Sequence, residues 1–186
     1  MELQEVIRAR RSVRRYHPEP PDRATIERLL ETAVRAPSAM NSQPWAFGVL
    51  TDRARMFDYS TRAKALLREN LVRMPWLERF RDRLDDTAWN IFHDAPALVI
   101  IYARPTGPHP QGDCAMAALA LMLAARDAGL GSCWIGLAAP LLDTPEVKAE
   151  LGVPAEYRVV APLVLGRPAD DPAPSERRPP ELVFWR

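Results

Sequence analysis

Hydrophobic residues recur along this chain at two spacings, which separate helical from extended segments. Apolar positions three and four apart predict helices over residues 2–11, 23–35, 114–128 and 145–152, and over most of 53–93. Alternation predicts a strand over 45–51, and short apolar runs predict further strands over 97–102, 132–135 and 157–165. Helices interleaved with strands in this way favour a layered α+β or α/β fold.

Polar residues and prolines mark where several of these elements begin or break. Asp22 and Asp113 precede helical segments as good N-caps, and Thr144-Pro145 is a typical helix start. Within 53–93 the helical pattern breaks at Met74-Pro75, because proline removes a backbone donor. This segment is charged on one side and apolar on the other, which favours a pair of surface helices.

The composition narrows the class of protein. A chain of 186 residues, 47% of them hydrophobic, is expected to form one domain with an ample core. The net charge of +1 argues against a protein that binds nucleic acid or an anionic membrane. The N-terminal residues include Glu2, Glu5 and several arginines, unlike a signal peptide, and the apolar run 115–125 is too short to span a bilayer. We therefore expect a cytoplasmic protein.

Metal and nucleophile chemistry has little support in the sequence. Cys114 and Cys133 lie in apolar segments and are best interpreted as free buried thiols. His17, His93 and His109 are scattered and form no ligand cluster. There is no glycine-rich phosphate loop, so a nucleotide-like cofactor would need another kind of phosphate site.

A stiff polar loop joins the helix 23–35 to the strand 45–51. Pro37 and Pro44 fix φ and restrict the residues before them. Between them the chain presents hydroxyl and amide side chains, those of Ser38, Asn41, Ser42 and Gln43. Such a loop is suited to holding the edge of a flat polar ligand. An ordinary proline- and serine-rich turn explains the same residues equally well.

A cluster of donors follows the first helical pattern. Arg10, Arg11, Ser12 and Arg14 lie within five positions of one another. Guanidinium groups and hydroxyls are natural donors to a phosphate dianion. The alternative is a basic patch in solvent, which is the usual fate of an arginine run.

Taken together and in this order, Arg-Arg-Ser-x-Arg and Pro-Ser-x-x-Asn-x-Gln-Pro-Trp resemble the nitroreductase family of flavin enzymes. The resemblance extends over nearly the whole chain and is poorest in the middle third. It implies a single domain, 1–186, of the α+β class, with a central mixed sheet flanked by helices. It also implies an intertwined homodimer with an exchanged C-terminal arm, 166–186, and makes the helical region 53–93 a candidate lid.

The resemblance implies FMN as the cofactor and assigns residues to its two ends. Arg10, Ser12, Arg14 and Arg177 would contact the phosphate, with Arg11 lying toward the ring. The partner subunit would bring its loop to the ring, with the residues Pro37, Ser38, Ala39 and Asn41. The backbone near Ile135 and Gly136 would face the flavin nitrogen that accepts hydride, and Trp134 beside them would also bind the cofactor. Without the family, an ordinary tight turn explains these residues equally well. Gln43 and Trp45 would fix the loop and fill the core.

This chain departs from the family pattern at several positions. Ser175 stands where many relatives have a second basic residue, which would weaken the grip on phosphate. Ala118 and Leu119 replace a common Gln-Asn pair. Ala88 and Ile91 stand near the places where other members contact the ribityl chain, and Asn90 is a candidate substitute.

The tail has an unusual composition. Five prolines after Gly166 favour an extended backbone, yet the chain finishes with the apolar run Leu182-Val183-Phe184-Trp185. The resemblance implies that this run packs on the partner subunit, which would carry Arg177 past the phosphate.

We therefore predict an FMN-dependent oxidoreductase working by a ping-pong cycle. NAD(P)H would reduce the flavin and leave, and a nitroaromatic, a quinone or a similar small oxidant would then be reduced on the same face. Two alternatives stay open. One is another flavin chemistry within the family, such as dehydrogenation, dehalogenation or flavin fragmentation, and the other is a non-catalytic flavin-binding protein.

Overall fold

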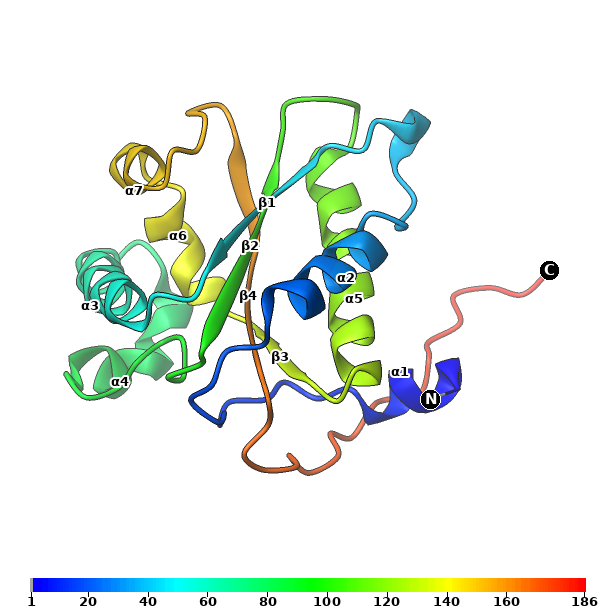
Figure 1. Cartoon of the computed structure of the whole chain (residues 1–186), viewed down its shortest axis with the longest axis horizontal. Helices are drawn as coiled ribbons and strands as arrows, with labels where there is room; N and C mark the ends of the chain where they lie inside the picture. The colour runs from blue at the N-terminus through cyan, green and yellow to red at the C-terminus, as the bar shows by residue number, and fades with distance from the viewer. Residues whose placement is uncertain (1) are drawn as a thin grey trace.

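The computed structural model describes residues 2–186 and contains a four-stranded sheet between two layers of helices (Figure 1). The strands are β1 (Trp45–Leu50), β2 (Ala97–Ala103), β3 (Gly131–Trp134) and β4 (Arg158–Gly166), in the spatial order β1-β2-β4-β3. Neighbouring strands are antiparallel throughout. The parallel component of the predicted mixed sheet is limited, within residues 2–186, to an isolated bridge between Ser12 and Ser132.

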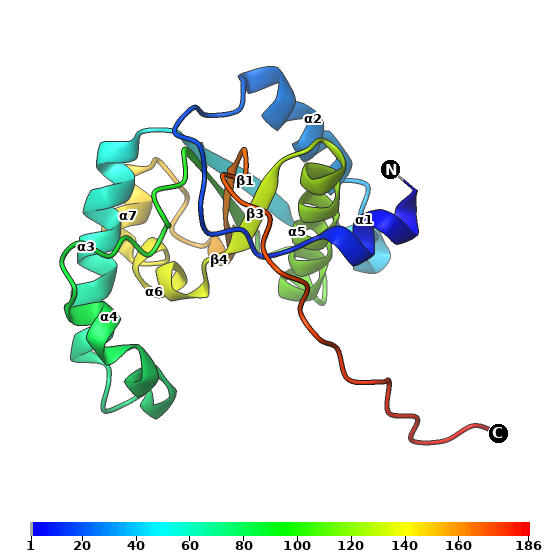
Figure 2. The same ribbon diagram turned by 90° about the horizontal axis from the view of Figure 1, so that it is seen from below.

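Helices cover both faces of the sheet (Figure 2). On one face lie α2 (Arg23–Ala33) and the long α5 (Pro110–Asp127), and on the other lie α3 (Arg53–Glu69), α6 (Ala139–Leu142) and α7 (Pro145–Glu150). The short helix α1 (Leu3–Ala9) packs against α5. The remaining turns of helix are η1 (Ala39–Asn41), η2 (Pro75–Phe80), α4 (Arg81–Asp85) and η3 (Gly136–Ala138).

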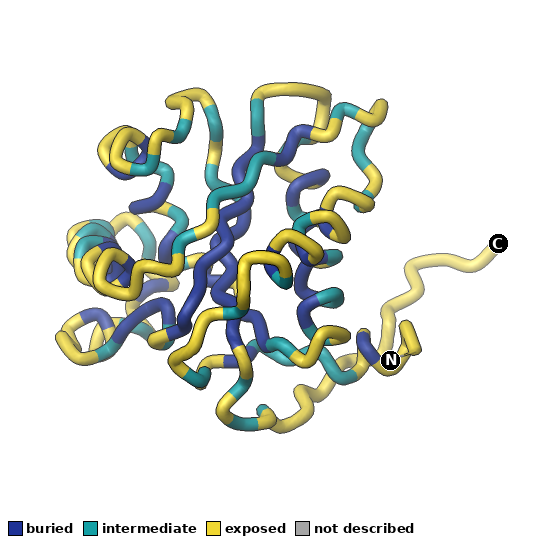
Figure 3. Tube along the Cα trace, in the orientation of Figure 1, coloured by how far each residue is buried: buried dark blue, intermediate teal, exposed yellow. Residues whose placement is uncertain are grey.

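The central strand β2 explains why both faces need a helical cover. All seven of its residues are buried. Val99 and Ile101 belong to the core with α2 and α5, whereas Leu98, Ile100 and Tyr102 belong to the core with α3 and α6. Because side chains alternate across a strand, an apolar run such as this one is stable only between two apolar layers. Strand β2 and most of β4 accordingly form the buried centre of the molecule, whereas the edge strand β1 is only partly buried (Figure 3).

The predicted caps are confirmed at two helices and wrong at a third. The Asp22 side chain accepts a hydrogen bond from the Thr25 N–H at 2.6 Å, and Thr144 caps α7 in the same way. Helix α5, however, begins at Pro110 with His109 as its N-cap, so Asp113 lies inside the helix. The buried Asp113 carboxylate instead accepts hydrogen bonds from the loop 37–43, so it is not used as a cap.

The N-terminal segment 12–17 and the segment after β4 are held side by side by backbone pairing. The Val13 N–H donates to the Ser132 carbonyl at 3.1 Å, which lays the N-terminal segment along β3. The His17 N–H donates to the Arg167 carbonyl and the Ala169 N–H to the Arg15 carbonyl, at 3.0 and 2.9 Å. The segment that follows β4 therefore runs back along the N-terminal segment.

The region 53–93 contains α3, η2 and α4, which confirms its helical character and its break at Pro75.

A buried lysine holds the last part of this region in place. Lys64 on α3 is 5% exposed, and its Nζ donates to the carbonyls of Asp86 and Trp89, each at 2.7 Å, and of Thr87 at 3.4 Å. One ammonium thus satisfies the backbone of a loop that has no regular structure of its own.

We expect Lys64→Met to lower the free energy of unfolding by about 2–3 kcal/mol, because it leaves three carbonyls without their charged donor. Chemical denaturation of the purified protein measures this loss, and protease cleavage within 86–89 reports the loosened loop. The control is Arg55→Met on the exposed side of the same helix, for which we expect a change below about 0.5 kcal/mol. Equal stability of the two variants would contradict the structural role of Lys64.

Candidate active site

The pairing of residues 12 and 13 with β3 determines the geometry of the candidate site. A Cβ atom at Gly131 would lie 2.7 Å from Val13 Cγ2, so only glycine permits this approach. The approach places the predicted arginine cluster beside the predicted ring-binding backbone of 134–136. Two motifs that are more than a hundred residues apart in the sequence therefore become neighbours.

The arginine cluster lines a cavity of about 200 Å³ between the N-terminal segment and the C-terminal arm. Arg177 and Ser175 reach the cavity from the arm. The structure thus brings together four residues that the sequence analysis assigned to a phosphate. The full lining is Arg10, Arg11, Ser12, Arg14, Pro172, Ala173, Ser175 and Arg177.

The charge of this cavity is uncompensated. Its lining contains four guanidinium groups and no carboxylate. Within residues 2–186 none of the four makes an ion pair, whereas the adjacent Arg15 pairs with Asp170 at 3.2 Å. Like charges gathered without counter-charges destabilise a protein, so the arrangement is typical of a site for an anion.

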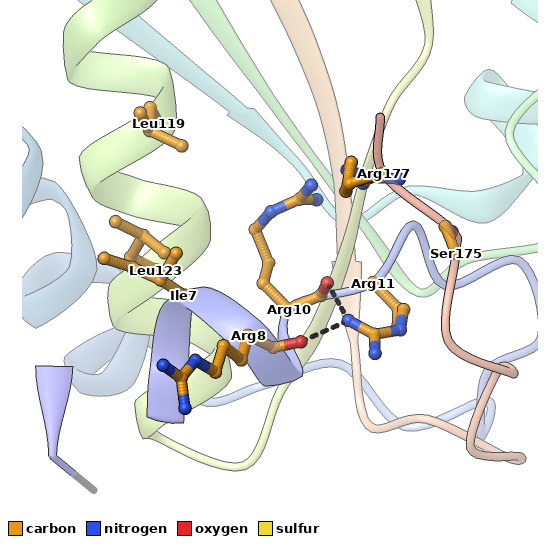
Figure 4. Close-up of a pocket in the computed structure, with 8 residues that line it drawn as sticks. All are labelled: Ile7, Arg8, Arg10, Arg11, Leu119, Leu123, Ser175 and Arg177. Carbon is orange, nitrogen blue, oxygen red and sulfur yellow. Dashed lines mark hydrogen bonds between the residues drawn. The ribbon is translucent and has the colours of Figure 1, made fainter. Parts of the chain in front are cut away.

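The side chain of Arg11 has a local structural role. Its Nη1 donates to the carbonyls of Arg8 and Arg10, the latter at 2.8 Å, and so closes the end of α1 (Figure 4). Arg177 likewise donates one bond to its own backbone, from Nη1 to the Glu176 carbonyl at 3.0 Å, which leaves its other donors for a ligand. Arg11 has a clear structural role, and its predicted place toward a ring stays a prediction.

A larger cavity of about 560 Å³ adjoins the first and shares Arg10, Arg11, Ser175 and Arg177 with it. Its other wall is apolar and comes from α1 and α5, with Ile7, Leu119 and Leu123 (Figure 4). Ile7 is 48% exposed and Leu119 is also 48% exposed. The departure from the family pattern at Leu119 therefore lies on an open apolar surface beside the arginines.

A third cavity, of about 320 Å³, lies on the other side of Arg14. It contains the predicted Trp134, Ile135 and Gly136, and Arg14 lines both this cavity and the arginine cavity. We call it the ring-side cavity. Its full lining is Arg14, Phe80, Arg83, Trp89, Ile91, His93, Cys133, Trp134, Ile135, Gly136 and Leu137.

The backbone of the ring-side cavity offers one open donor. The Ile135 N–H is used within the sheet, where it donates to the Pro162 carbonyl at 2.8 Å. The Gly136 N–H, at the start of η3, has no acceptor among the described residues, and Gly136 is exposed. Of the two backbone groups predicted to face a ring, Gly136 is therefore the one that is free to donate.

His93 is a site residue that the sequence analysis missed. Burial, with the nearby charges of Arg14 and Arg83, lowers the pKa of His93 to about 4, so the imidazole is neutral near pH 7. His93 and Asp94 both have positive φ, 56° and 52°, a strained conformation that is uncommon outside glycine. A single histidine without a partner motif carries no sequence signal that could have revealed this position.

Both cysteines are buried and free, as predicted. Burial raises the pKa of the Cys133 thiol, and the neighbouring Arg14 and Ser12 oppose that effect in part. Burial likewise raises the pKa of Cys114 to about 11. Both thiols are therefore protonated near neutral pH and are poor nucleophiles.

The loop 37–43 lies far from α1 in the fold, at the upper right of Figure 1, and lines none of these three cavities. It is strained, because Met40, Asn41 and Gln43 have φ of 55°, 53° and 44°. Such conformations persist only where surrounding contacts impose them, and they cluster at functional sites. Met40 is 90% exposed at its tip.

The contacts that hold the loop come from its own side chains, from α5 and from Arg104, whose Nη2 donates to the Gln43 carbonyl. The buried Asp113 carboxylate accepts from the Ala39 N–H at 3.2 Å and from the Ser42 hydroxyl at 3.4 Å. Gln43 fixes the loop as predicted, since its N–H donates to Ser38 Oγ and its Nε2 to Asn41 Oδ1, both at 3.0 Å. The Ser38 hydroxyl hydrogen and the Asn41 amide nitrogen remain available to a ligand.

The comparisons with known proteins agree with this geometry. The family model named Nitroreductase family matches residues 7–167. This chain belongs to the nitroreductase family. The crystal structure of a nitroreductase with bound FMN from Bacteroides fragilis superposes with a TM-score of 0.81 at 29% identity, covering 100% of this chain and 98% of that one. The predicted fold class is thereby confirmed.

Curated relatives of this nitroreductase-family protein carry different names. It is 33% identical to a 5,6-dimethylbenzimidazole synthase of Rhodospirillum rubrum, over 95% of this chain and 87% of that protein. It is 29% identical to an iodotyrosine deiodinase of Thermotoga neapolitana, over 98% of this chain and 97% of that protein. Membership of the family therefore leaves the reaction open.

Residues 2–186 contain no group of three or more His, Cys, Asp or Glu side chains placed to hold a metal ion. None of their helices is both long enough and apolar enough to cross a membrane.

We expect Asp113→Ala to release the loop 37–43 and to lower the free energy of unfolding by about 1–3 kcal/mol, because the Ala39 N–H loses its buried acceptor. Limited proteolysis near Met40 and chemical denaturation measure the two effects. Asp113→Asn keeps an acceptor oxygen and should lose less, and Gln111→Ala on the exposed side of α5 serves as the control. A loop in Asp113→Ala as resistant to protease as in the control would contradict this anchoring role.

Proposed function

We propose that this protein is an FMN-dependent oxidoreductase that transfers a hydride from NAD(P)H to a small oxidant such as a quinone or a nitroaromatic compound. The observation that carries the proposal is the convergence of Arg10, Arg14 and Arg177 on one cavity without a carboxylate. No structural need of the fold explains this convergence, and a phosphate dianion does. Relatives solved with bound FMN support the choice of that phosphate ester.

The residues fit FMN at both of its ends. Arg10, Ser12, Arg14 and Arg177 would hold the phosphate through charge-assisted hydrogen bonds. Arg14 also lines the ring-side cavity, so one residue connects the phosphate end to the ring end. There the Gly136 N–H would donate to the ring edge, and such a fixed donor stabilises negative charge that develops on reduction. Ser175 supplies a hydroxyl in place of a second basic residue.

FMN, when bound, supplies the hydride carrier, and the protein supplies binding, orientation and exclusion of water. Overall, NAD(P)H gives up a hydride, solvent gives a proton, and a quinone that receives both becomes a hydroquinone. His93 and Cys133 are neutral near pH 7 in the ring-side cavity. Among the described residues, the Gly136 N–H and the guanidinium groups of Arg14 and Arg83 would be available around the ring.

We also propose that the site is completed across a homodimer. Ser38 and Asn41 have free polar groups on a strained loop that is remote from the cavities of its own chain. Exposed apolar side chains on α1 and α5 offer a surface for a second copy, among them Leu3, Ile7, Met116 and Leu119. In such a dimer the loop of one subunit would serve the ring-side cavity of the other.

The C-terminal arm supports the same assembly. Leu182, Val183, Phe184 and Trp185 are 68%, 88%, 74% and 88% exposed, and the arm extends away from the body of the molecule (Figure 2). Such an apolar run is unfavourable in water. Packing on a partner subunit would bury it and would hold Arg177 at the arginine cavity.

Two measurements on the purified protein test the proposed activity. One is its absorbance spectrum, and the other is its steady consumption of NADH or NADPH with menadione as the oxidant. Flavin released on denaturation and sustained turnover support it. A protein that neither contains nor takes up FMN would refute it. Flavin without turnover would favour a binding protein instead, and a dimethylbenzimidazole or dehalogenated product would place it with the other reactions of its relatives.

Arg10→Ala and Arg14→Ala should each weaken FMN binding by about 10- to 150-fold. The range follows from about 1.5–3 kcal/mol for a hydrogen bond to a charged group, with 1.4 kcal/mol per factor of ten. Quenching of FMN fluorescence measures the Kd. Arg15→Ala removes the same charge from the same segment outside the cavity and should change the Kd by less than about threefold. Equal effects of all three substitutions would refute the phosphate assignment.

Deletion of residues 181–186 should weaken the dimer and lower FMN occupancy, because it removes the apolar run of the arm. Sedimentation velocity across a dilution series measures the dimer, and the ratio of flavin to protein absorbance measures occupancy. Deletion of Arg186 alone leaves the apolar run intact and should behave as the parent. A truncated protein that stays a stable dimer with full FMN occupancy would refute the proposed role of the arm.

A further inference from the structure

The ring-side cavity has a second wall that none of the family motifs explains. One wall is Arg14 with residues 133–137, which the proposed function places beside the flavin ring. The other wall comes from η2, α4 and the loop after it, with Phe80, Arg83, Trp89, Ile91 and His93. This is the candidate lid region, where the family resemblance is poorest. A substrate lying on the ring would contact this wall.

The second wall is aromatic. Phe80 and Trp89 are both half-buried, and the His93 ring lies edge-on to Trp89 with 6.5 Å between centroids. Trp134 stands on the opposite wall. Flat apolar faces on two sides favour a flat aromatic ligand, through offset or edge contacts between rings. The cavity has about 320 Å³, part of which the flavin ring would occupy, so the space left beside the second wall suits a small, single-ring compound.

The second wall also carries one cation without a counter-charge. Arg83 lies with its guanidinium carbon 5.9 Å from the Trp89 ring centroid. Within residues 2–186 it makes no ion pair, whereas Arg81 pairs with Glu78 and Asp85 pairs with Arg68. No Asp or Glu lines the cavity. An arginine stacked on an aromatic ring keeps its donors free for a carboxylate.

The wall is held in place before any ligand arrives. Lys64 fixes the carbonyls of Asp86, Thr87 and Trp89, so the segment between Arg83 and Trp89 is fastened to α3. The strained backbone at His93 and Asp94 follows directly. Preorganised groups lose less entropy on binding, so they discriminate better between ligands.

We propose that this wall selects aromatic acids, with Arg83 as the specificity-determining residue that receives the acid group of the substrate. The aromatic ring of the substrate would lie between the flavin ring and the pair Phe80 and Trp89, and the neutral His93 would add a hydrogen bond. This inference rests on the proposed function, because it takes the ring-side cavity as the place where the oxidant binds. The substrate class is a single-ring aromatic carboxylate with a reducible group, such as a nitro group.

The test compares an anionic with a neutral substrate of similar size, 4-nitrobenzoate and 4-nitrobenzyl alcohol. In the parent, kcat/KM should favour the acid. Arg83→Gln should lower the ratio of kcat/KM for acid over alcohol by about 5- to 30-fold, as expected for a part-exposed charged hydrogen bond. Arg83→Lys keeps the charge and should restore part of the ratio.

Arg79→Gln is the matched control. Arg79 belongs to the same segment, lies with its guanidinium carbon 4.9 Å from the Phe80 ring centroid, and does not line the cavity. Its substitution removes the same charge and should leave the ratio unchanged. An equal fall in both variants would show a long-range field rather than a contact and would overturn the proposal. A fall in kcat/KM for NAD(P)H alone would overturn it in favour of a nucleotide-phosphate contact.

A binding measurement separates this inference from the proposed function. Benzoate and benzyl alcohol are titrated against the protein, with tryptophan fluorescence as the readout because Trp89 and Trp134 line the cavity. Benzoate should bind more tightly, and Arg83→Gln should remove the difference. Turnover of neutral substrates without any preference for the acid would refute the inference and leave the oxidoreductase intact. Selective benzoate binding by a protein without turnover would support the cavity and refute the reaction.

Discussion

The backbone pairing of the N-terminal segment with β3 is the interaction on which the candidate site depends. A single strand edge receives residues 12 and 13, and Gly131 permits the approach because a Cβ there would collide with Val13. The same segment then pairs with residues 167–169. A Cβ at Gly166 would likewise lie 2.7 Å from Pro96. Two glycines at the ends of neighbouring strands thus let the segments 12–17 and 167–169 meet at one edge of the sheet.

The pairing of these segments gathers positive charges that contribute nothing to the stability of the fold. Arg10, Arg14 and Arg177 have no ion-pair partners within residues 2–186, although carboxylates are as frequent as basic residues in the chain. Some arginines elsewhere on the surface are paired, as Arg62 is with Asp58 and Glu150. What sets the arginine cavity apart is that four guanidinium groups gather in one place without a carboxylate, as a site for an anion requires.

Two irregular segments, the aromatic wall of the ring-side cavity and the loop 37–43, which is remote from it, are each held by a buried polar group. Lys64 satisfies the carbonyls behind the aromatic wall, and Asp113 satisfies the loop 37–43. Both groups are almost completely buried, at 5% and 2% exposure. Burying an ionisable group costs free energy unless the group is hydrogen-bonded. Here the hydrogen bonds that offset this cost are the ones that fix the two loops. Fixed loops of this kind are what selective binding requires.

The sequence by itself determined the elements, the family resemblance and the donors. Hydrophobic spacing located β2 and α5, and Asp22 was identified as a cap, because these signals depend only on neighbours along the chain. Only the tertiary structure decided what Asp113 does, that His93 and Arg83 share a cavity with Trp134, and that Arg14 joins two cavities. Asp113 satisfies every local rule for a cap, yet a strained loop brought to it by the folded sheet uses the carboxylate instead. Such contacts join residues far apart in the chain, so local patterns carry no trace of them.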